Sequence, residues 1–210
     1  MKLQVALDRL TEEECLLVLN EIGDLAEWIE VGTGVIKQYG MAIVTRIKKD
    51  WPDAVLVADM KTCDAGKSES SQAFLAGADV TTVMAFADDR TITEALRIAG
   101  QQGKQVMIDL LGVVDVQRID RLYELGARLF SVHRGKDMQE QSGQAAADVP
   151  FMEHLRALPD ARFSYAGGVN EHTIARLLPY RPDVLIVGGA ITGATDRRAA
   201  AQRIRGEMTG

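Results

Sequence analysis

Short apolar runs rich in Val, Ile and Leu alternate along the chain with longer segments of helical periodicity. Runs of this kind, apolar on both faces and bounded by turn residues, are typical of buried parallel strands. Eight such runs occur, at residues 3–7, 27–31, 54–58, 79–83, 105–108, 128–132, 162–165 and 183–187. Strands and helices in alternation predict a parallel sheet with crossover helices.

The segments between the runs carry helix signals. Thr11 precedes three glutamates, which predicts an N-cap followed by an acidic first turn. Residues 91–99, 116–125 and 171–178 place apolar side chains at helical spacing and are predicted to be helices. Residues 137–149 are rich in Gln, Gly and Ala and predict a loop after the sixth strand.

Eight repeated units favour an α/β fold of the (β/α)8 TIM barrel type, a single catalytic domain over residues 1–210. An open, doubly wound parallel sheet is the alternative. A chain of 210 residues is near the lower end of the barrel range, so its loops are predicted to be short.

Composition narrows the classes of function. The net charge of -6 argues against a general nucleic-acid binder, which would present a basic face. No stretch approaches the roughly 20 apolar residues needed to cross a bilayer, and the first residues are not expected to act as a signal peptide, because Asp8 follows so soon. Two cysteines, Cys15 and Cys63, without metal-type spacing predict a reduced cytoplasmic protein.

Charged side chains stand at the ends of the predicted strands, where barrel enzymes place their chemistry. These residues are Asp8, Glu30, Asp59, Lys61, Asp64, Asp109 and His133. A buried carboxylate is costly unless it is paired or bound to metal, so a ring of acids at one barrel mouth requires cations. Lys61 supplies one, and a divalent metal is the natural second. Oxygen ligands favour magnesium over zinc.

Some of these residues have simpler explanations. Asp8 could cap the first helix, Glu30 could be a buried structural acid, and His133 could be a hydrogen-bonded core histidine. Asp59 and Lys61 have a weaker structural explanation. They are two residues apart, so an extended chain points both to one side, and an acid–base pair facing a barrel mouth has no packing purpose.

Two glycine pairs follow the last two strands, Gly167–Gly168 and Gly188–Gly189. Glycine lets backbone N–H groups approach an anion closely, and barrels often bind phosphate after strands seven and eight. A helix predicted to start at Asn170 would add a positive dipole. The pairs therefore predict a phosphate site.

Together these residues resemble the orotidine monophosphate decarboxylase superfamily. Asp59, Lys61 and Asp64 match its Asp-x-Lys-x-x-Asp signature. Within the superfamily, residues 3–8, 29–33, 108–112, 166–168 and 187–192 look like the 3-hexulose-6-phosphate synthases. The resemblance extends nearly from end to end.

The resemblance implies a metal-dependent aldolase, a lyase that adds formaldehyde to D-ribulose 5-phosphate through an enediolate. It also implies Mg²⁺ (or Mn²⁺) bound by Glu30 and Asp59, and a homodimer with active sites at the interface. Asp64 would reach into the neighbouring subunit's site. Lys61 would stabilise the enediolate together with Asp59 and Asp64, which hold it in place, and His133 or Asp59 would move the C1 proton.

The remaining expected roles concern the substrate. Asp109 would orient its hydroxyl groups or a water molecule. Expected substrate-binding residues are Asp8, Glu30, Lys136, Ala166, Gly167, Gly168, Gly188 and Gly189, with the N–H groups of the last three glycines on the phosphate.

The alternative with related chemistry is 3-keto-L-gulonate-6-phosphate decarboxylase, which shares most of these residues. That enzyme usually has Glu in place of Asp109, Arg in place of Lys136, Thr in place of Ala166 and Arg in place of Ala190. Asp109, Ala166 and Ala190 favour the synthase. Lys136 matches neither activity well, because it lacks the guanidinium group with which Arg makes two parallel hydrogen bonds. A non-catalytic regulator that binds phosphosugars is a further alternative, although it would need neither Lys61 nor His133.

Overall fold

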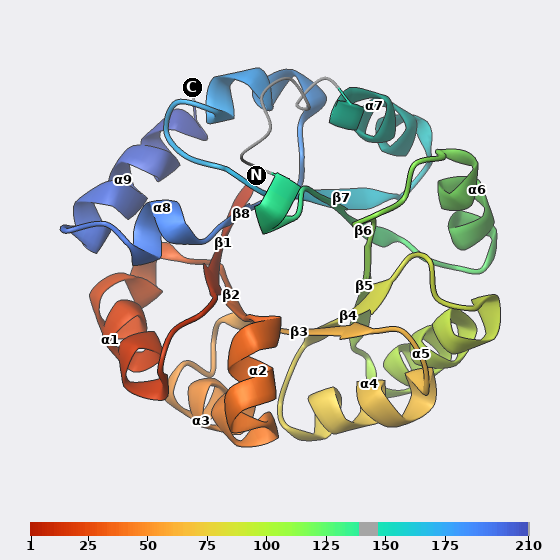
Figure 1. Ribbon diagram of the computed structural model, residues 1–210, viewed down its shortest axis with the longest axis horizontal. Helices are drawn as coiled ribbons and strands as arrows, with labels where there is room; N and C mark the ends of the chain where they lie inside the picture. The colour runs from red at the N-terminus through yellow and green to blue at the C-terminus, as the bar shows by residue number, and fades with distance from the viewer. Residues whose placement is uncertain (139–146, 210) are drawn as a thin grey trace.

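The computed structural model describes residues 1–138 and 147–209, and it shows eight parallel strands closed into a barrel (Figure 1). Each strand pairs with the next in the chain, and β8 pairs with β1. The strands are β1 (Lys2–Leu7), β2 (Trp28–Val31), β3 (Val55–Thr62), β4 (Val80–Met84), β5 (Gln105–Asp109), β6 (Leu129–His133), β7 (Arg162–Ala166) and β8 (Val184–Val187). The predicted TIM barrel is confirmed, and the open sheet is excluded.

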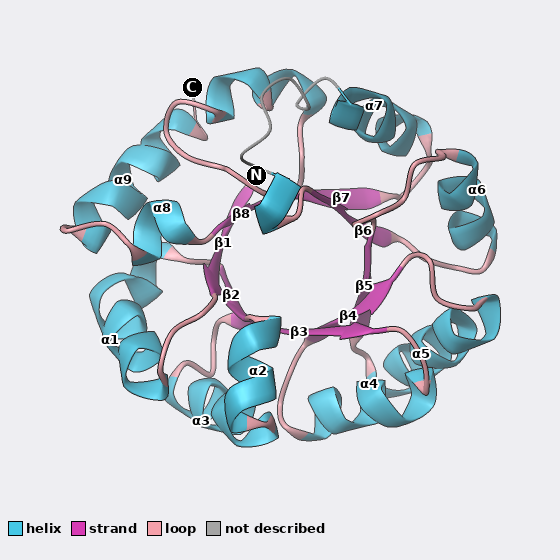
Figure 2. Ribbon diagram, in the orientation of Figure 1, coloured by secondary structure: helices cyan, strands magenta, loops and turns pink. Residues whose placement is uncertain are grey.

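Helices surround the barrel on the outside (Figure 2). They are α1 (Glu12–Ile22), α2 (Thr33–Tyr39), α3 (Met41–Asp50), α4 (Gly66–Leu75), α5 (Asp89–Gln102), α6 (Gln117–Glu124), α7 (Val149–Ala157), α8 (Gly189–Thr192) and α9 (Arg197–Glu207). Short 3-10 helices are η1 (Gly23–Leu25), η2 (Lys136–Met138), η4 (Ile174–Arg176) and η5 (Leu178–Tyr180). None of the helices in the described part of the chain has the length and hydropathy needed to cross a membrane.

The first helix begins as the sequence predicts. Thr11 Oγ1 accepts a hydrogen bond from the backbone N–H of Glu14, and the Glu14 carboxylate accepts one from the Thr11 N–H. This reciprocal capping box satisfies two donors that the first turn leaves without intrahelical partners. Because Thr11 caps α1, the alternative role for Asp8 as its cap is wrong.

Alternation along the strands divides the interior into two packed regions. Leu3, Val5 and Leu7 of β1 pack outward against the helices, whereas Ala6 faces the barrel interior. The interior cluster is Ala6, Trp28, Val57, Val80, Met107, Leu129, Ala166, Val184 and Ile186. Successive strand residues point to opposite faces. The inward positions beyond this apolar layer are therefore the ones that reach the carboxyl-terminal mouth of the barrel.

The helix predicted at residues 171–178 does not form. Only the 3-10 turns η4 and η5 occur there. Local hydrogen bonds compete with the helix, because Asn170 Oδ1 accepts from the His172 N–H and Thr173 Oγ1 accepts from the Asn170 N–H. Pro179 also disfavours helical backbone in the residue before it.

Two further differences concern strand and loop bounds. β3 continues to Thr62, so Asp59 and Lys61 lie within the strand rather than after it. Most of the loop predicted at 137–149 lies outside the described residues, which resume at residue 147.

Candidate active site

A cavity of about 590 Å³ lies at the carboxyl ends of the strands. Apart from Asp64, every residue predicted from the sequence to belong to the site lines it. These residues are Asp8, Glu30, Asp59, Lys61, Asp109, His133, Lys136, Ala166, Gly167, Gly168, Gly188 and Gly189. They come from β1, β2, β3, β5, β6, β7 and β8 or from the residues that follow them. The barrel topology thus brings together side chains that are far apart in the chain.

Lys61 joins two buried carboxylates. Its Nζ lies 2.7 Å from Asp59 Oδ2 and 3.1 Å from Asp109 Oδ2. The amine is poorly solvated, which disfavours its charged form, but the two carboxylates outweigh this effect and raise the pKa of Lys61. Lys61 therefore carries a positive charge at neutral pH and holds it inside the cavity.

The backbone around Lys61 explains how the lysine reaches this position. Its φ is 47°, and the pairing of β3 with β4 shifts between Ala58 and Thr62. Such an irregularity re-aims side chains near the end of a strand. The Lys61 N–H donates to Thr82 Oγ1 at 2.8 Å, which anchors the irregular segment. The prediction that an extended chain brings Asp59 and Lys61 together is therefore wrong in its reason, although the two side chains do meet.

Asp109 and His133 form a second pair. His133 Nδ1 lies 2.9 Å from Asp109 Oδ2 and 3.1 Å from Oδ1. Burial opposes ionisation of Asp109, but the His133 hydrogen bond and the nearby positive charges outweigh burial and lower its pKa. An ionised Asp109 accepts the Nδ1 proton, so Nε2 carries the lone pair of the neutral imidazole. His133 lines the cavity, which excludes the alternative of a core histidine.

Glu30 is only 7% exposed, and its Oε2 accepts a hydrogen bond of 2.6 Å from Gln4 Nε2. Burial, reinforced by the negative charges of Asp59 and Asp8, raises the pKa of Glu30 well above its usual value. A neutral amide does not compensate a buried carboxylate charge. Glu30 therefore needs a proton or a cation at this buried position.

Asp8 lies over Gly32. A Cβ atom at Gly32 would be 1.9 Å from Asp8 Oδ1 and 2.7 Å from the Leu7 carbonyl oxygen, so only glycine leaves room for this carboxylate. Burial and the charge of Asp59 raise the pKa of Asp8. The site thus concentrates more negative charge than Lys61 alone can balance.

Asp64 does not join this group. It is exposed, its Oδ1 accepts from the Ala65 N–H at 2.6 Å, and it lines a separate groove with residues of α4 and α5. The carboxylates that hold Lys61 in place within this chain are Asp59 and Asp109. The expectation that Asp64 holds Lys61 is therefore corrected for a single chain.

The two glycine pairs lie on the same wall of the cavity. Gly167 has a φ of 105°, and a Cβ there would come within 2.4 Å of the Arg134 carbonyl oxygen. Because no helix starts at Asn170, the predicted helix dipole does not contribute at this point. Arg9 and Lys136 also line the cavity and supply positive charge to it.

Some residues of the site escaped sequence reasoning. Thr33 Oγ1 donates to Asp59 Oδ2, and Thr82 Oγ1 donates to Asp59 Oδ1, both at 2.7 Å. Gln4 supports Glu30. A polar residue at an inward position of a buried strand was the available signal for Gln4 and Thr82. Thr33 and Arg9 lie outside the strands and carry no such signal.

The donor groups of the cavity decide which metal it can hold. Among the described residues, no group of three or more His, Cys, Asp or Glu side chains has the arrangement of a metal site. Magnesium, unlike zinc, does not need three protein ligands, since it is usually held by one or two carboxylates together with water and substrate oxygens. Glu30 and Asp59 fit that donor set, and a divalent cation would balance the excess of carboxylates.

Comparison with known proteins assigns the chain to a family. The family model described as orotidine 5'-phosphate decarboxylase / HUMPS matches residues 1–204. The chain belongs to this family. A relative in the orotidine 5'-phosphate decarboxylase / HUMPS family, named 3-hexulose-6-phosphate synthase from Mycobacterium gastri, is 39% identical over 206 residues, which covers 98% of each chain.

Solved structures agree with this assignment. A 3-hexulose-6-phosphate synthase from Salmonella typhimurium is 37% identical, with a TM-score of 0.94 over 100% of this chain and 99% of that one. A 3-keto-L-gulonate-6-phosphate decarboxylase from Vibrio cholerae is 27% identical, with a TM-score of 0.87 over 99% and 97% of the two chains. The family fold is therefore common to relatives named for two different reactions.

Proposed function

We propose that this protein is a 3-hexulose-6-phosphate synthase, a lyase that joins formaldehyde to D-ribulose 5-phosphate. The observation that carries the proposal is the placement of Lys61 between Asp59 and Asp109 in a cavity that Glu30 and His133 also line. The full-length similarity to proteins named as this synthase supports it.

The glycines would bind the substrate phosphate. Gly168, Gly188 and Gly189 line one wall of the cavity and offer backbone N–H groups to an anion. Lys136 lies on the same cavity and adds positive charge. Binding the phosphate there fixes one end of the sugar, so its first carbons would lie near the charged residues.

Glu30 and Asp59 would hold Mg²⁺ (or Mn²⁺). When bound, the metal would supply a Lewis acid that draws negative charge from the oxygens of the sugar. Thr33, Thr82 and Gln4 orient the two carboxylates by hydrogen bonds of 2.6 to 2.7 Å. Such supporting contacts fix the direction in which a ligand oxygen points.

His133 would move the proton at C1. Its Nδ1 is held by Asp109, so Nε2 accepts the proton that leaves C1, and the electron pair remains on the substrate as an enediolate. Lys61 places a fixed positive charge beside that developing negative charge. C1 then forms a bond to the formaldehyde carbon, and the formaldehyde oxygen takes up a proton. The product is a 3-hexulose 6-phosphate.

The decarboxylase remains the second candidate, because the related decarboxylase structure shares the fold over nearly the full chain. Its reaction would begin with loss of carbon dioxide and would form the same type of enediolate. Asp109, Ala166 and Ala190 all line the cavity, so the three positions that favour the synthase lie where they can contact a substrate.

A pair of assays tests the proposal. Purified protein with ribulose 5-phosphate, formaldehyde and Mg²⁺ is expected to consume formaldehyde, whereas 3-keto-L-gulonate 6-phosphate is expected to release little carbon dioxide. EDTA is expected to stop turnover, and added Mg²⁺ to restore it. Carbon dioxide release without formaldehyde consumption would identify the decarboxylase, and full activity after exhaustive EDTA treatment would exclude the metal.

We also propose a homodimer in which Asp64 contributes to the partner's site. A groove of about 720 Å³ runs between α4 and α5 beside Asp64. Leu75 on α4 is 84% exposed, and Phe86 after β4 is 60% exposed. Large apolar side chains left open beside a groove are typical of interaction surfaces. A second copy seated there would bring Asp64 toward a cavity other than its own.

The dimer can be tested by sedimentation and by subunit mixing. Leu75→Glu is expected to shift the protein toward the monomer, whereas Leu17→Glu on α1, also at an exposed leucine, should not. Mixing inactive Asp64→Asn with inactive Lys61→Met should restore about a quarter of the activity, because half of the dimers are mixed and each has one intact site. A monomeric wild-type protein, or no recovery on mixing, would refute this arrangement.

A reducing, cytoplasmic setting completes the proposal. Cys15 and Cys63 are both free thiols, one buried and one exposed. Burial raises the pKa of Cys15 to about 11, which makes this thiol unreactive at neutral pH.

A further inference from the structure

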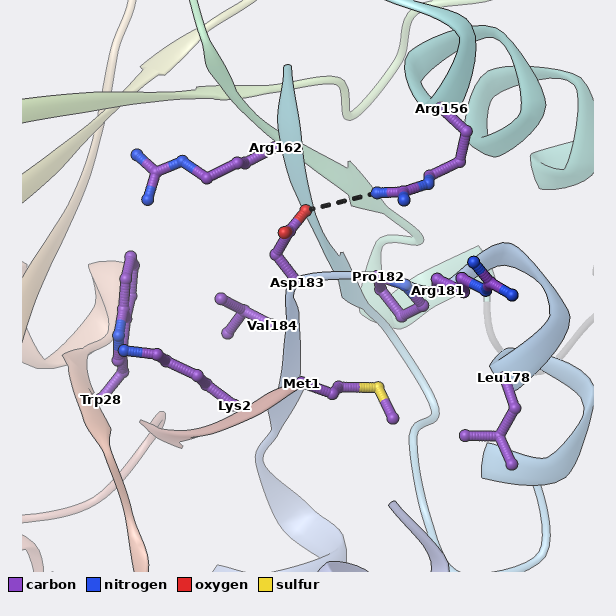
Figure 3. A pocket seen from close by; sticks show the side chains of 10 residues that line it. All are labelled: Met1, Lys2, Trp28, Arg156, Arg162, Leu178, Arg181, Pro182, Asp183 and Val184. Atoms are coloured by element: carbon purple, nitrogen blue, oxygen red, sulfur yellow. Dashed lines mark ion pairs between the residues drawn. The ribbon is translucent and has the colours of Figure 1, made fainter. Parts of the chain in front are cut away.

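A second cavity, drawn from close by in Figure 3, has a volume of about 450 Å³. It opens at the opposite end of the barrel from the candidate active site. It is lined where β1, β2, β7 and β8 begin, by Lys2, Trp28, Arg162 and Val184, and by residues that precede β8. None of its lining residues also lines the active-site cavity. Ligand binding here would therefore be a property separate from the proposed reaction.

The charge of this cavity is opposite to that of the chain. Lys2, Arg156, Arg162 and Arg181 line it together with a single carboxylate, Asp183, which leaves three net positive charges. The whole chain has a net charge of -6. All four cationic side chains are exposed, and together they create a positive potential at this end of an otherwise acidic chain.

The available carboxylate does not neutralise this group. Asp183 Oδ2 accepts a hydrogen bond of 2.9 Å from the Phe163 N–H and lies 4.0 Å from Arg156 Nη1. Arg162 donates to the neutral side chain of Gln105. In the parts of the chain that the structure describes, Lys2, Arg162 and Arg181 take part in no ion pair with an acid.

Trp28 provides an independent indication of a ligand. The residue is 4% exposed, it lines this cavity, and its indole Nε1–H has no hydrogen-bond partner among the described residues. Buried donors without an acceptor are uncommon in folded proteins and call for an explanation. Because Nε1 itself is covered, an oxygen atom of a bound anion would become its acceptor through a small shift of the side chains around the indole.

We propose that this cavity binds a small anion that carries at least two phosphate or carboxylate groups. Figure 3 shows two cationic sides, with Lys2 and Arg162 on the side of Trp28 and with Arg156 and Arg181 on the other side of Asp183. A ligand with two anionic groups matches that division, and arginine binds both types of group through paired hydrogen bonds.

The fluorescence of Trp28 can report anion binding in this cavity directly. The chain has two tryptophans, so Trp51→Phe leaves Trp28 as the only one. Titration of this variant with tripolyphosphate, and separately with citrate, is carried out at ionic strength held constant with KCl. A saturable change in fluorescence is expected with at least one anion.

Two sets of substitutions locate the binding. Arg162→Gln with Arg181→Gln is expected to weaken the affinity at least about tenfold, because two charge-assisted contacts are lost. These residues lie outside the catalytic cavity, so turnover is expected to continue. Lys136→Gln, at the active-site cavity, should leave the Trp28 signal unchanged. If the double variant unfolds, Arg181→Gln alone replaces it.

The outcomes separate the possibilities. Binding of tripolyphosphate alone identifies a phosphate ligand, and binding of citrate alone a carboxylate ligand. No saturable signal with either anion would overturn the proposal. So would a signal that Lys136→Gln removes and the arginine substitutions leave intact, since the anion would then be bound at the active site. None of these results depends on whether the chain has synthase activity.

Discussion

Replacing Lys61 with Met removes the positive charge that joins two buried carboxylates while keeping a side chain of similar length. In the folded protein the Asp59 and Asp109 side chains are 6% and 3% exposed, and the Lys61 side chain is 26% exposed. Breaking a buried ion pair by removing one partner typically costs about 3–5 kcal/mol. The variant can limit this cost, because one carboxylate can bind a proton instead.

Protonation of one carboxylate sets an upper limit on the stability that the variant loses, and this limit depends on pH. Keeping a carboxyl group with an ordinary pKa of about 3.9 protonated costs about 4 kcal/mol at pH 7 and about 1.5 kcal/mol at pH 5. We therefore expect Lys61→Met to lower the free energy of unfolding by about 3–4 kcal/mol at pH 7 and by less than about 2 kcal/mol at pH 5.

The sign of this pH dependence follows from a comparison of the wild type with the Lys61→Met variant. The raised pKa of Lys61 means that its contribution in the wild type is fully present below the unfolded pKa of about 10.4, and it is lost only as the pH rises through the folded pKa. The wild-type contribution from Lys61 is therefore constant between pH 5 and 7. The change comes from proton uptake by the variant.

Urea denaturation followed by circular dichroism at both pH values, in EDTA, measures the difference. Lys49→Met on α3, at an exposed lysine, is the matched control and should change stability by less than about 0.5 kcal/mol. An equal loss at pH 5 and pH 7, or no loss at all, would refute the view that Lys61 neutralises two buried carboxylates. Turnover by Lys61→Met would refute its role at the enediolate.

Three other substitutions test separate parts of the structure. Thr82→Val removes a donor to Asp59 and should weaken Mg²⁺ activation of turnover by about tenfold or more, measured by metal titration. Burial raises the pKa of Asp79, but hydrogen bonds from a backbone N–H and two lysines outweigh it, and the net pKa is lowered. Asp79→Asn should therefore cost about 2 kcal/mol at pH 7 in urea denaturation, a loss that shrinks as the pH falls below about 4, through the folded pKa of Asp79. Gly167→Ala should lower the melting temperature more than Gly168→Ala, because both have positive φ but only Gly167 has a carbonyl oxygen 2.4 Å from the added carbon.

The fold was predictable because parallel strands buried on both faces leave a strong pattern in the sequence. Eight apolar runs gave the barrel, and the charged residues predicted near the strand ends include every charged residue of the cavity lining except Arg9. The structure moved the strand bounds by a few residues, as at β3, where the strand continues through Asp59 and Lys61. Hydrophobic pattern marks where a strand is buried, but hydrogen bonding decides where it ends.

The errors arise where local chemistry overrides the pattern. Residues 171–178 have helical spacing, yet Asn170 and Thr173 bond to the backbone and Pro179 limits the end of the segment. Asp64 shares a sequence signature with Lys61, but Lys61 has a φ of 47° and the chain then turns outward toward α4. Supporting residues such as Gln4 and Thr82 depend on contacts across strands, which spacing along one segment does not reveal.

The outward side chains of each strand pack against helices, and the inward ones line the lumen. This division between packing and binding positions has an evolutionary consequence. Outward side chains hold the helices, whereas each strand contributes only a few inward side chains to the lumen. Asp109 and Ala166 are both inward, on β5 and β7. A change as small as one methylene group at either place alters what the lumen contacts without disturbing the outer shell. Such a scaffold can acquire new reactions while its stability is inherited almost unaltered.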